Sequence, residues 1–422
     1  MRKWYSLYDK VYSNVNLLSA YQKVKANRGA SGVDGVRISD FDKKREEELD
    51  QLEKELKEKR YIPEPVKRVY IPKSDGSERP LGIPTVGDRV VQQALLNVLQ
   101  PIFDPGFHPS SYGYRPGRSA AQAVAKAERF SNRWGLNYVV DMDLSKCFDT
   151  LDHDLIIAGV REKVRDGSVL SLIRQMLEAG IMDKGKYHAT KVGSPQGGVI
   201  SPLLMNIYLD KFDQYMKGQG IRIVRYADDI LIFARTRGEA GKYRQIATEY
   251  LEKELLLTVN VRKTHLTTIW DGMAYLGFII THRGLRIHPK SVKKFKDKIR
   301  ELTPRNSGRN VELQIKEVSQ LLRGFAGYFR IAQVKTLFRE IMSWVRRRLR
   351  MKQMREWKSW KGLHKQLRRL GYKGSLEKIS MTRWRNASCH LIHKALPNEW
   401  FNQLGLYNME KVQTNTLHQY YE

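Results

Sequence analysis

Apolar residues recur along the 422-residue chain with two different spacings, and the spacing changes from one segment to the next. Repeats of three and four residues predict amphipathic helices. Short runs of β-branched and aromatic residues predict strands. The helical pattern covers most of residues 1–60 and then 88–99, 120–130, 168–181, 202–216 and 239–255. Strand patterns occur at 138–144 and on both sides of 228–229, so we expect an α+β fold.

Carboxylates lie between two of the predicted strands and inside a third. Asp228 and Asp229 lie at or beside the turn of a predicted hairpin, where aspartate is common for its own hydrogen-bonding reasons. Asp141 and Asp143 share one face of the strand 138–144, and charges in an apolar strand are costly to bury unless they are paired or bound to metal. Carboxylates that converge from separate strands form an oxygen site suited to Mg²⁺. Two such ions can bridge an in-line phosphoryl displacement.

The composition indicates which substrate such a centre would use. The chain carries 75 Lys and Arg against 45 Asp and Glu, a net charge of +30. An acidic centre in a strongly basic chain indicates an enzyme that acts on nucleic acid. Only Cys147 and Cys389 are present, which excludes a disulfide framework and suits a reducing cytosol. We expect no membrane partner, because the first residues do not read as a secretory signal and no apolar run approaches the ~20 residues of a membrane span.

Two motifs resemble those of a known family. Tyr226-Ala227-Asp228-Asp229 resembles the signature of reverse transcriptases, and residues 193–206 (GSPQGGVISPLLMN) resemble a segment typical of group II intron reverse transcriptases. Other matching blocks keep the family's order from about residue 30 to the C-terminus. The chain therefore resembles a group II intron-encoded reverse transcriptase and maturase of the compact, group IIC-like type. No Cys/His pattern of an HNH endonuclease domain is present in the sequence.

The resemblance implies a right-hand polymerase with an antiparallel palm sheet backed by helices. Fingers and palm would occupy 1–290, with an N-terminal extension over 1–60. A helical thumb or maturase domain would follow at 291–360, and a small basic DNA-binding domain at 361–422. Charge supports a boundary near 290, because residues 1–290 hold 46 Lys and Arg against 35 Asp and Glu, whereas the remainder holds 29 against 10.

The same resemblance assigns catalytic roles. Asp143, Asp228 and Asp229 would hold two Mg²⁺ ions, with the backbone carbonyl of Leu144 as a further ligand. From the strand pattern alone, either Asp141 or Asp143 could be the ligand. The family pattern, in which the ligand stands five residues before an aromatic, selects Asp143.

Residues that match the family's nucleotide contacts are spread over several segments. Lys73 and Arg79 stand on the two arms of a predicted hairpin, where the sequence favours a triphosphate contact and an internal salt bridge equally. The family resemblance favours the contact with the nucleotide triphosphate over the salt bridge. It also assigns nucleotide contacts to Gln196 and to Lys263, which would assist the leaving pyrophosphate. Phe148 would be a steric gate against ribonucleotides, although its spacing alone suits a core aromatic.

Arginines are expected to contact the nucleic-acid backbone in two places. Arg115 and Arg118 belong to a block of aromatics, glycines and arginines that leads into a helix. Arg346, Arg347 and Arg350 lie in a helix beside an apolar stripe that contains a tryptophan. A solvated basic face is the alternative for this helix.

These features predict a polymerase that copies RNA by adding deoxynucleotides to a primer 3′ end. The resemblance further implies binding of a group II intron RNA, to assist its splicing and retrohoming, with an RNA template, a DNA primer, target DNA and dNTPs as other partners. The expected location is the bacterial cytoplasm, in association with ribonucleoprotein or nucleoid. The sequence leaves open a domesticated reverse transcriptase in defence or DNA repair. A pure RNA-binding splicing factor with an inactive polymerase site is another alternative, against which the intact aspartates argue.

Overall fold

In the computed structural model the chain forms two compact units, Met1–Thr268 and Ile269–Glu422. The structure describes residues 2–72, 76, 78–306, 308 and 310–421. Each unit combines helices with antiparallel strands, and the α+β fold class expected from the sequence is confirmed.

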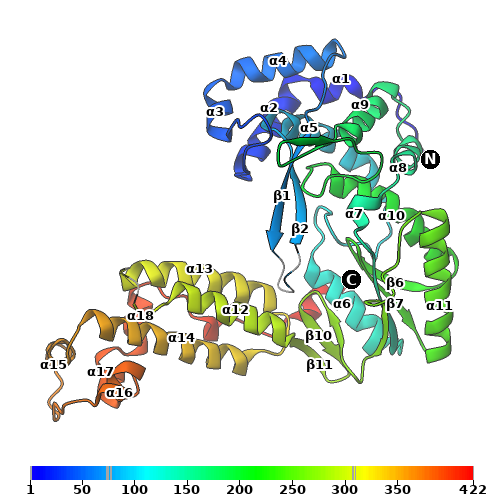
Figure 1. Ribbon diagram of the computed structural model, residues 1–422. Coiled ribbons are helices and arrows are strands. Elements are labelled where there is room, and N and C mark those ends of the chain that lie inside the picture. Colours follow the sequence, from blue (N-terminus) through cyan, green and yellow to red (C-terminus); the bar gives the residue numbers. More distant parts are fainter. Residues whose placement is uncertain (1, 73–75, 77, 307, 309, 422) are drawn as a thin grey trace. The chain divides into compact units, whose positions relative to one another are not determined.

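The first unit begins with a helical region (Figure 1), whose buried side chains belong to the same apolar core as Val140 and Ile232 much further along the chain. Its helices are α1 (Tyr8–Tyr12), α2 (Asn14–Ala26), α3 (Ile38–Lys43), α4 (Arg45–Lys57) and α5 (Val86–Phe103). α2 lies in the segment predicted to be helical, and its Leu17, Tyr21 and Val24 are buried in this core at helical spacing. α5 begins where the Thr85 hydroxyl accepts a hydrogen bond from the Asp88 backbone nitrogen, an N-cap that fixes the start of the helix.

A small mixed sheet follows, with strand order β2-β1-β4-β5. Its strands are β1 (Val66–Pro72), β2 (Glu78–Ile83), β4 (Ile181–Asp183) and β5 (Lys186–His188). β1 and β2 form the hairpin predicted from the sequence, in a register that sets Ile71 opposite Arg79. β4 pairs with β1 in parallel, which brings residues from beyond position 180 to the edge of the hairpin.

A second sheet, with order β6-β7-β3-β8, is antiparallel throughout. Its strands are β3 (Tyr138–Asp143), β6 (Arg222–Tyr226), β7 (Asp229–Ala234) and β8 (His265–Thr268). Residues 230–234 of the central strand β7 are all buried, as expected for an apolar run in the middle of a covered sheet. The sheet contacts α6 (Ala120–Glu128), α10 (Ser201–Gly218) and α11 (Arg237–Glu249), so the predicted antiparallel sheet backed by helices is confirmed (Figure 1).

Shorter helical segments complete the first unit. They are η1 (Asp104–Gly106), η2 (Arg129–Arg133), α7 (Cys147–Thr150), α8 (His153–Arg161), α9 (Gly167–Glu178) and η3 (Tyr250–Glu254). The Asp152 carboxylate accepts a hydrogen bond from the Leu155 backbone nitrogen and caps α8. Asp149 lies inside α7.

The second unit starts with a three-stranded sheet and continues in three longer helices that run side by side (Figure 1). The strands are β9 (Met273–Tyr275), β10 (Phe278–Thr281) and β11 (Gly284–Ile287), and the helices are α12 (Pro289–Leu302), α13 (Val311–Phe329) and α14 (Lys335–Glu356). Shorter segments follow: α15 (Trp360–Arg369), α16 (Met381–Asn386), α17 (His390–Ala395), α18 (Asn398–Gln403), η4 (Met409–Lys411) and η5 (Leu417–Tyr420).

The division between the units falls before the boundary near 290 that charge predicts. The reason is the packing of the β9–β11 sheet on α13. The Phe278 ring lies 5.5 Å from that of Tyr328 and 5.0 Å from that of Phe329, and the Tyr328 hydroxyl donates to the Leu276 carbonyl. These strands therefore share a core with the helices that follow them. The three domain boundaries expected from the sequence remain predictions.

Candidate active site

A cavity in the first unit collects most of the catalytic and nucleotide-binding residues that the sequence singled out. Its volume is about 740 Å³, and its walls come from β1, β2, the end of β3, α7 and the segment 190–196. The lining includes Arg79, Asp143, Leu144, Phe148, Gln196, Asp228 and Lys263. Lys73 lies outside the described residues.

The three aspartates meet at one end of the antiparallel sheet. Asp143 is the last residue of β3 and stands opposite Asp229, the first residue of β7. Asp228 is exposed in the two-residue connection between β6 and β7, where it follows Ala227. The backbone of Ala227 has a φ of 60°, in the left-handed region that residues other than glycine rarely adopt. The hairpin thus presents one carboxylate at its turn and a second at the start of the returning strand.

Negative charge is concentrated around Asp229. Burial raises the pKa of Asp229 to about 7, and three neighbouring carboxylates add to the shift: those of Asp141, Asp228 and Asp143. The pKa of Asp141 is also raised, chiefly by burial. A cation bound beside Asp229 and Asp141 would favour the ionised form of both carboxylates.

The structure does not bring a ready-made metal cluster together. Among the described residues, no three His, Cys, Asp or Glu side chains are grouped as they would be around a metal ion. The Asp143 carboxylate is instead contacted by Lys263, whose Nζ lies 3.6 Å away, and accepts a hydrogen bond from Asn260 Nδ2 at 3.1 Å. The donors available are nevertheless carboxylate and carbonyl oxygens, the type that Mg²⁺ prefers, so the residues fit such an ion chemically.

The segment that carries Gln196 is fixed against the hairpin. The Gly82 backbone nitrogen donates to the Gln196 carbonyl at 2.8 Å. At the next position Gly197 has a φ of 123°, and a Cβ there would overlap the Gly82 carbonyl oxygen. Only glycine fits this approach at position 197. Gln196 is half-buried in the cavity wall and lines the same space as Arg79.

Phe148 lies in α7, directly after the β3 strand. Its ring is 8% exposed and lines the cavity, and its backbone carbonyl accepts a hydrogen bond from Ser194. The residue is therefore both a core aromatic, as its spacing suggests, and a wall of the cavity.

Sequence reasoning missed Arg68 and Asn260. Arg68, on β1, lines the cavity, and its buried Nε has no hydrogen-bond partner among the described residues. Asn260 holds the Asp143 carboxylate, as described above. The available signals were weak: Arg68 is one of several basic residues on the hairpin arm, and Asn260 stands three residues before Lys263.

The expected nucleic-acid contact of Arg115 has to be corrected. Its side chain is buried, with Nε donating to Asp104 Oδ1 at 2.8 Å and Nη1 to the carbonyls of His108 and Ser111. A guanidinium whose donors are used inside the protein has little left for a phosphate. Arg118 is half-buried over the Tyr112 ring, at 5.4 Å, and its predicted contact remains a prediction.

Two arginines of α14 require the same correction. Arg346 and Arg350 are each only 4% exposed. Arg346 Nη1 donates to Glu410 Oε1 at 2.8 Å, whereas Arg350 Nε donates to the Leu396 carbonyl at 2.9 Å. They hold the C-terminal segment onto α14 and do not present their charge outward.

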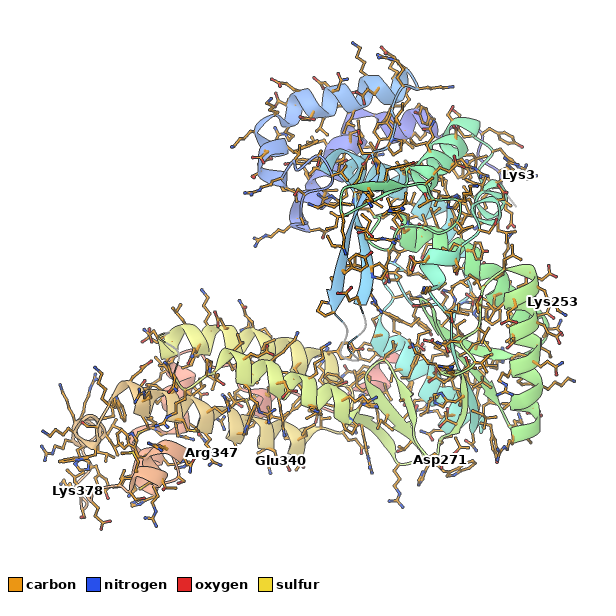
Figure 2. The ribbon with its side chains drawn as sticks, viewed as in Figure 1. Lys3, Lys253, Asp271, Glu340, Arg347 and Lys378 are labelled. Atoms are coloured by element: carbon orange, nitrogen blue, oxygen red, sulfur yellow. The ribbon has the colours of Figure 1, made fainter. Side chains whose placement is uncertain are left out.

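Arg347 is exposed and differs from these neighbours. It lies on α14 beside α16, and its Nε donates to the Asn386 carbonyl at 3.1 Å (Figure 2). Its predicted contact with nucleic acid remains a prediction.

Comparison with known proteins agrees with the geometry of the cavity. Residues 71–280 match the family described as reverse transcriptase (RNA-dependent DNA polymerase), and residues 292–371 match the group II intron maturase-specific domain. Protein YkfC of Escherichia coli is 36% identical over 313 residues, which cover 64% of this chain and 80% of that protein. The chain belongs to the reverse transcriptases that carry a group II intron maturase domain. Polymerases of this family depend on metal ions, and their substrates are nucleic acids.

Other relatives of this reverse transcriptase are matched over shorter stretches. The group II intron-encoded protein LtrA of Lactococcus lactis is 38% identical over 198 residues, which are 47% of this chain but only 33% of LtrA. A solved structure of telomerase from Candida tropicalis is 17% identical, covers 53% of this chain and 55% of its own, and superposes with a TM-score of 0.41, on which we base no inference. In the part of the chain that the structure describes, no helix is long and apolar enough to cross a membrane.

Proposed function

We propose that this reverse transcriptase extends a DNA primer on an RNA template in the 740 Å³ cavity. The observation that carries the proposal is the register of the palm sheet. It sets Asp143 opposite Asp229, beside the turn that bears Asp228. Carboxylates that line a cavity whose hairpin wall carries arginines match the two ends of a nucleoside triphosphate reaction.

In this proposal Asp143, Asp228 and Asp229, with the Leu144 carbonyl, hold two Mg²⁺ ions. When bound, the ions would activate the primer hydroxyl and neutralise charge on the triphosphate. The raised pKa of Asp229 supports this assignment, because burial and three neighbouring carboxylates disfavour its charged form, and a bound cation would offset both effects. The amide of Asn260 orients the Asp143 carboxylate, a supporting role typical of groups behind a metal ligand.

The opposite wall would bind the triphosphate. Arg79 lines the cavity from the hairpin, and Arg68 adds a buried guanidinium nitrogen that lacks a protein partner among the described residues. We assign Lys73 to the same role on the family resemblance alone. Lys263 would stabilise the leaving pyrophosphate, and Gln196 would position the nucleotide. The Phe148 ring would exclude a 2′-hydroxyl.

A second proposed activity is the binding of group II intron RNA to assist splicing and retrohoming. The maturase-specific domain at 292–371 supports it, as does the excess of 29 Lys and Arg over 10 Asp and Glu in residues 291–422. The relative LtrA is named as a group II intron-encoded protein. The proposed partners are therefore intron RNA, an RNA template with a DNA primer, target DNA and dNTPs, in a bacterial cytoplasm and in association with ribonucleoprotein or nucleoid.

The test is primer extension on an RNA template with Mg²⁺, combined with RNA binding measured on the same samples. We expect Asp228→Asn to abolish extension while RNA affinity stays within a few-fold, because one carboxylate is a small part of a large basic surface. Asp50→Asn, an exposed aspartate on α4, is the matched control and should extend like the wild type. Extension by Asp228→Asn at near the wild-type rate would show that the metal assignment is wrong.

A further inference from the structure

A fully buried ion pair lies behind the turn that carries Asp228. Arg225 on β6 and Asp213 on α10 both have side chains that are 0% exposed. Arg225 donates from Nε and from Nη2 to the Asp213 carboxylate, at 2.9 and 2.6 Å. Burying both charges carries a large desolvation penalty, so a buried pair is in itself weak evidence for stability. The role of Arg225 therefore has to be sought in the other hydrogen bonds of its guanidinium group.

The remaining donors of Arg225 lead to the turn. Its Nη1 donates to the Ala227 carbonyl at 2.9 Å and to Asn206 Oδ1 at 3.0 Å. Ala227 immediately precedes Asp228 and has the left-handed φ of 60°. Because a residue with a Cβ adopts that conformation only when its surroundings enforce it, the bond to the Ala227 carbonyl constrains a turn that the chain would otherwise leave.

A neighbouring segment encloses the same turn. Asn206 Nδ2 donates to the Gly113 carbonyl at 2.9 Å, and a Cβ on Gly113 would overlap the Ala227 backbone nitrogen. The Arg225 backbone nitrogen donates to Ser110, and the backbone nitrogen of residue 112 donates to Arg225, both at 2.9 Å. The turn is therefore held between residues 110–113 and α10, with Arg225 bonded to both.

We propose that Arg225 and Asp213 are positioning residues that fix the Asp228 turn and thereby set the affinity of the site for divalent cations. This inference rests on the proposed function, which assigns those cations to Asp228 and its two neighbouring carboxylates. Lysine cannot take the place of Arg225, because a single ammonium group cannot reproduce the planar fork that reaches a carboxylate, an amide and a backbone carbonyl together.

Two variants test the positioning role, so that the test can still be made if one of them does not fold. Arg225→Lys keeps the charge and removes the fork. The double variant Arg225→Met with Asp213→Leu removes both charges, so that neither remains buried and unpaired. The readouts are Mn²⁺ binding to the protein alone by electron paramagnetic resonance, hydrogen exchange of peptides that cover residues 222–234, and steady-state kinetics. We expect faster exchange in the turn and a loss of about 10- to 100-fold in Mn²⁺ affinity and kcat, with KM for the dNTP changed far less.

Met216→Ala, near the end of the same helix α10, is the control for lost stability alone. Its buried side chain is removed while the contacts of Arg225 remain, so Mn²⁺ affinity and exchange of the turn should stay at wild-type values. Wild-type Mn²⁺ affinity and exchange in folded Arg225→Lys would overturn the inference. If Asp228→Asn also leaves Mn²⁺ affinity and extension unchanged, the proposed function itself fails. If only Asp228→Asn has an effect, the failure is confined to the positioning role.

Discussion

The two units use their charged side chains in opposite ways. In the first unit, carboxylates and cations line a cavity of about 740 Å³ and are available to a ligand. In α14 of the second unit, Arg346 and Arg350 are 4% exposed and are bonded to Glu410 and to the Leu396 carbonyl. Both regions are rich in charge, but only in the first do charged residues that the sequence singled out, among them Asp143, Arg79 and Lys263, line a cavity. In α14, charge serves to attach one part of the unit to another.

The two regions differ in how far a local sequence pattern determines the direction in which a side chain points. Strand positions alternate between two faces, and a hairpin turn ends at the edge of its sheet, so a motif such as that at 226–229 fixes where its carboxylates point. A run of arginines on a helix points in several directions, because a helix turns once in 3.6 residues. Which direction is covered depends on distant segments: the partners of Arg350 and Arg346 lie 46 to 64 residues further along the chain.

The largest expected effect is a loss of kcat, and it should differ between Asp143 and Asp141, the two carboxylates on one face of β3. Asp143 lines the cavity, whereas the described lining does not include Asp141, which stands opposite Leu231 and His265. We expect Asp143→Asn to lower kcat by about 10³-fold or more, and Asp141→Asn by about tenfold at most, because only the first removes a proposed metal ligand. The measurement is single-nucleotide extension with saturating dNTP and Mg²⁺.

Circular dichroism of both variants provides the control, since each substitution preserves shape and should leave the fold intact. The assignment from family spacing would be reversed if Asp141→Asn proved to be the inactive variant.

A smaller effect is expected on the stability of the second unit. Arg350→Ala removes two hydrogen bonds of a buried guanidinium, one to the Leu396 carbonyl and one to Asn398 Oδ1. The loss should destabilise the packing of α17 and α18 on α14 by about 2–4 kcal/mol. Hydrogen exchange of peptides from these helices measures it. Arg339→Ala, an exposed position on α14, should change stability by about 0.5 kcal/mol or less.

If Arg350→Ala instead left exchange unchanged and weakened RNA binding, the original expectation of a nucleic-acid contact would be restored. The salt dependence of RNA binding, measured beside exchange, distinguishes the two results, because a buried arginine neutralises no phosphate and therefore releases no counterion from the RNA.

Much of the fold could be predicted, because the local spacing of apolar residues determines which segments form helices and which form strands. The helical spacing of apolar residues over 1–60 predicted helices such as α2, and two apolar runs predicted the strands β6 and β7 around the aspartates. The strand order could not be predicted in the same way. Nothing in residues 66–83 indicates that β1 takes β4 as its second neighbour, in parallel. Pairings between distant segments follow from packing of the whole unit, not from any one stretch.

Likewise, only some residues of the candidate site could be predicted from local sequence. Its carboxylates were predicted because they interrupt apolar strands, where a charge needs an explanation. Arg68 and Asn260 were missed, since a basic residue on a hairpin arm and an asparagine in a loop are common without any function. The Arg225–Asp213 pair was also missed, because its partners meet only when β6 packs on α10. Local sequence thus identified the reactive groups but not those that hold them.

The steric role of Phe148 is expected to show a moderate effect. Phe148→Val opens the wall of the cavity without introducing polarity, and discrimination by a clash should weaken when the ring is removed. The ratio of kcat/KM for a ribonucleotide to that for the matching deoxynucleotide should rise by about tenfold or more. Cys147→Ala, at the adjacent buried position, is the control for altered packing. A constant ratio with both rates reduced would show that the ring only fills the core.

The smallest expected effect concerns Arg347, the exposed member of the arginine run. Unlike Arg346 and Arg350, Arg347 is exposed to solvent. Its Nε donates a hydrogen bond to the Asn386 carbonyl. If Arg347 contacts a phosphate, Arg347→Ala should reduce the slope of log affinity against log salt by roughly 0.7–0.9, with little change in stability. Glu340→Gln, an exposed acidic position on the same helix, is the matched control and should not reduce the slope (Figure 2). RNA binding titrated at several salt concentrations measures both. An unchanged slope for Arg347→Ala would mean that the exposed side of this helix is solvated, and that none of the three arginines predicted from charge density contacts nucleic acid.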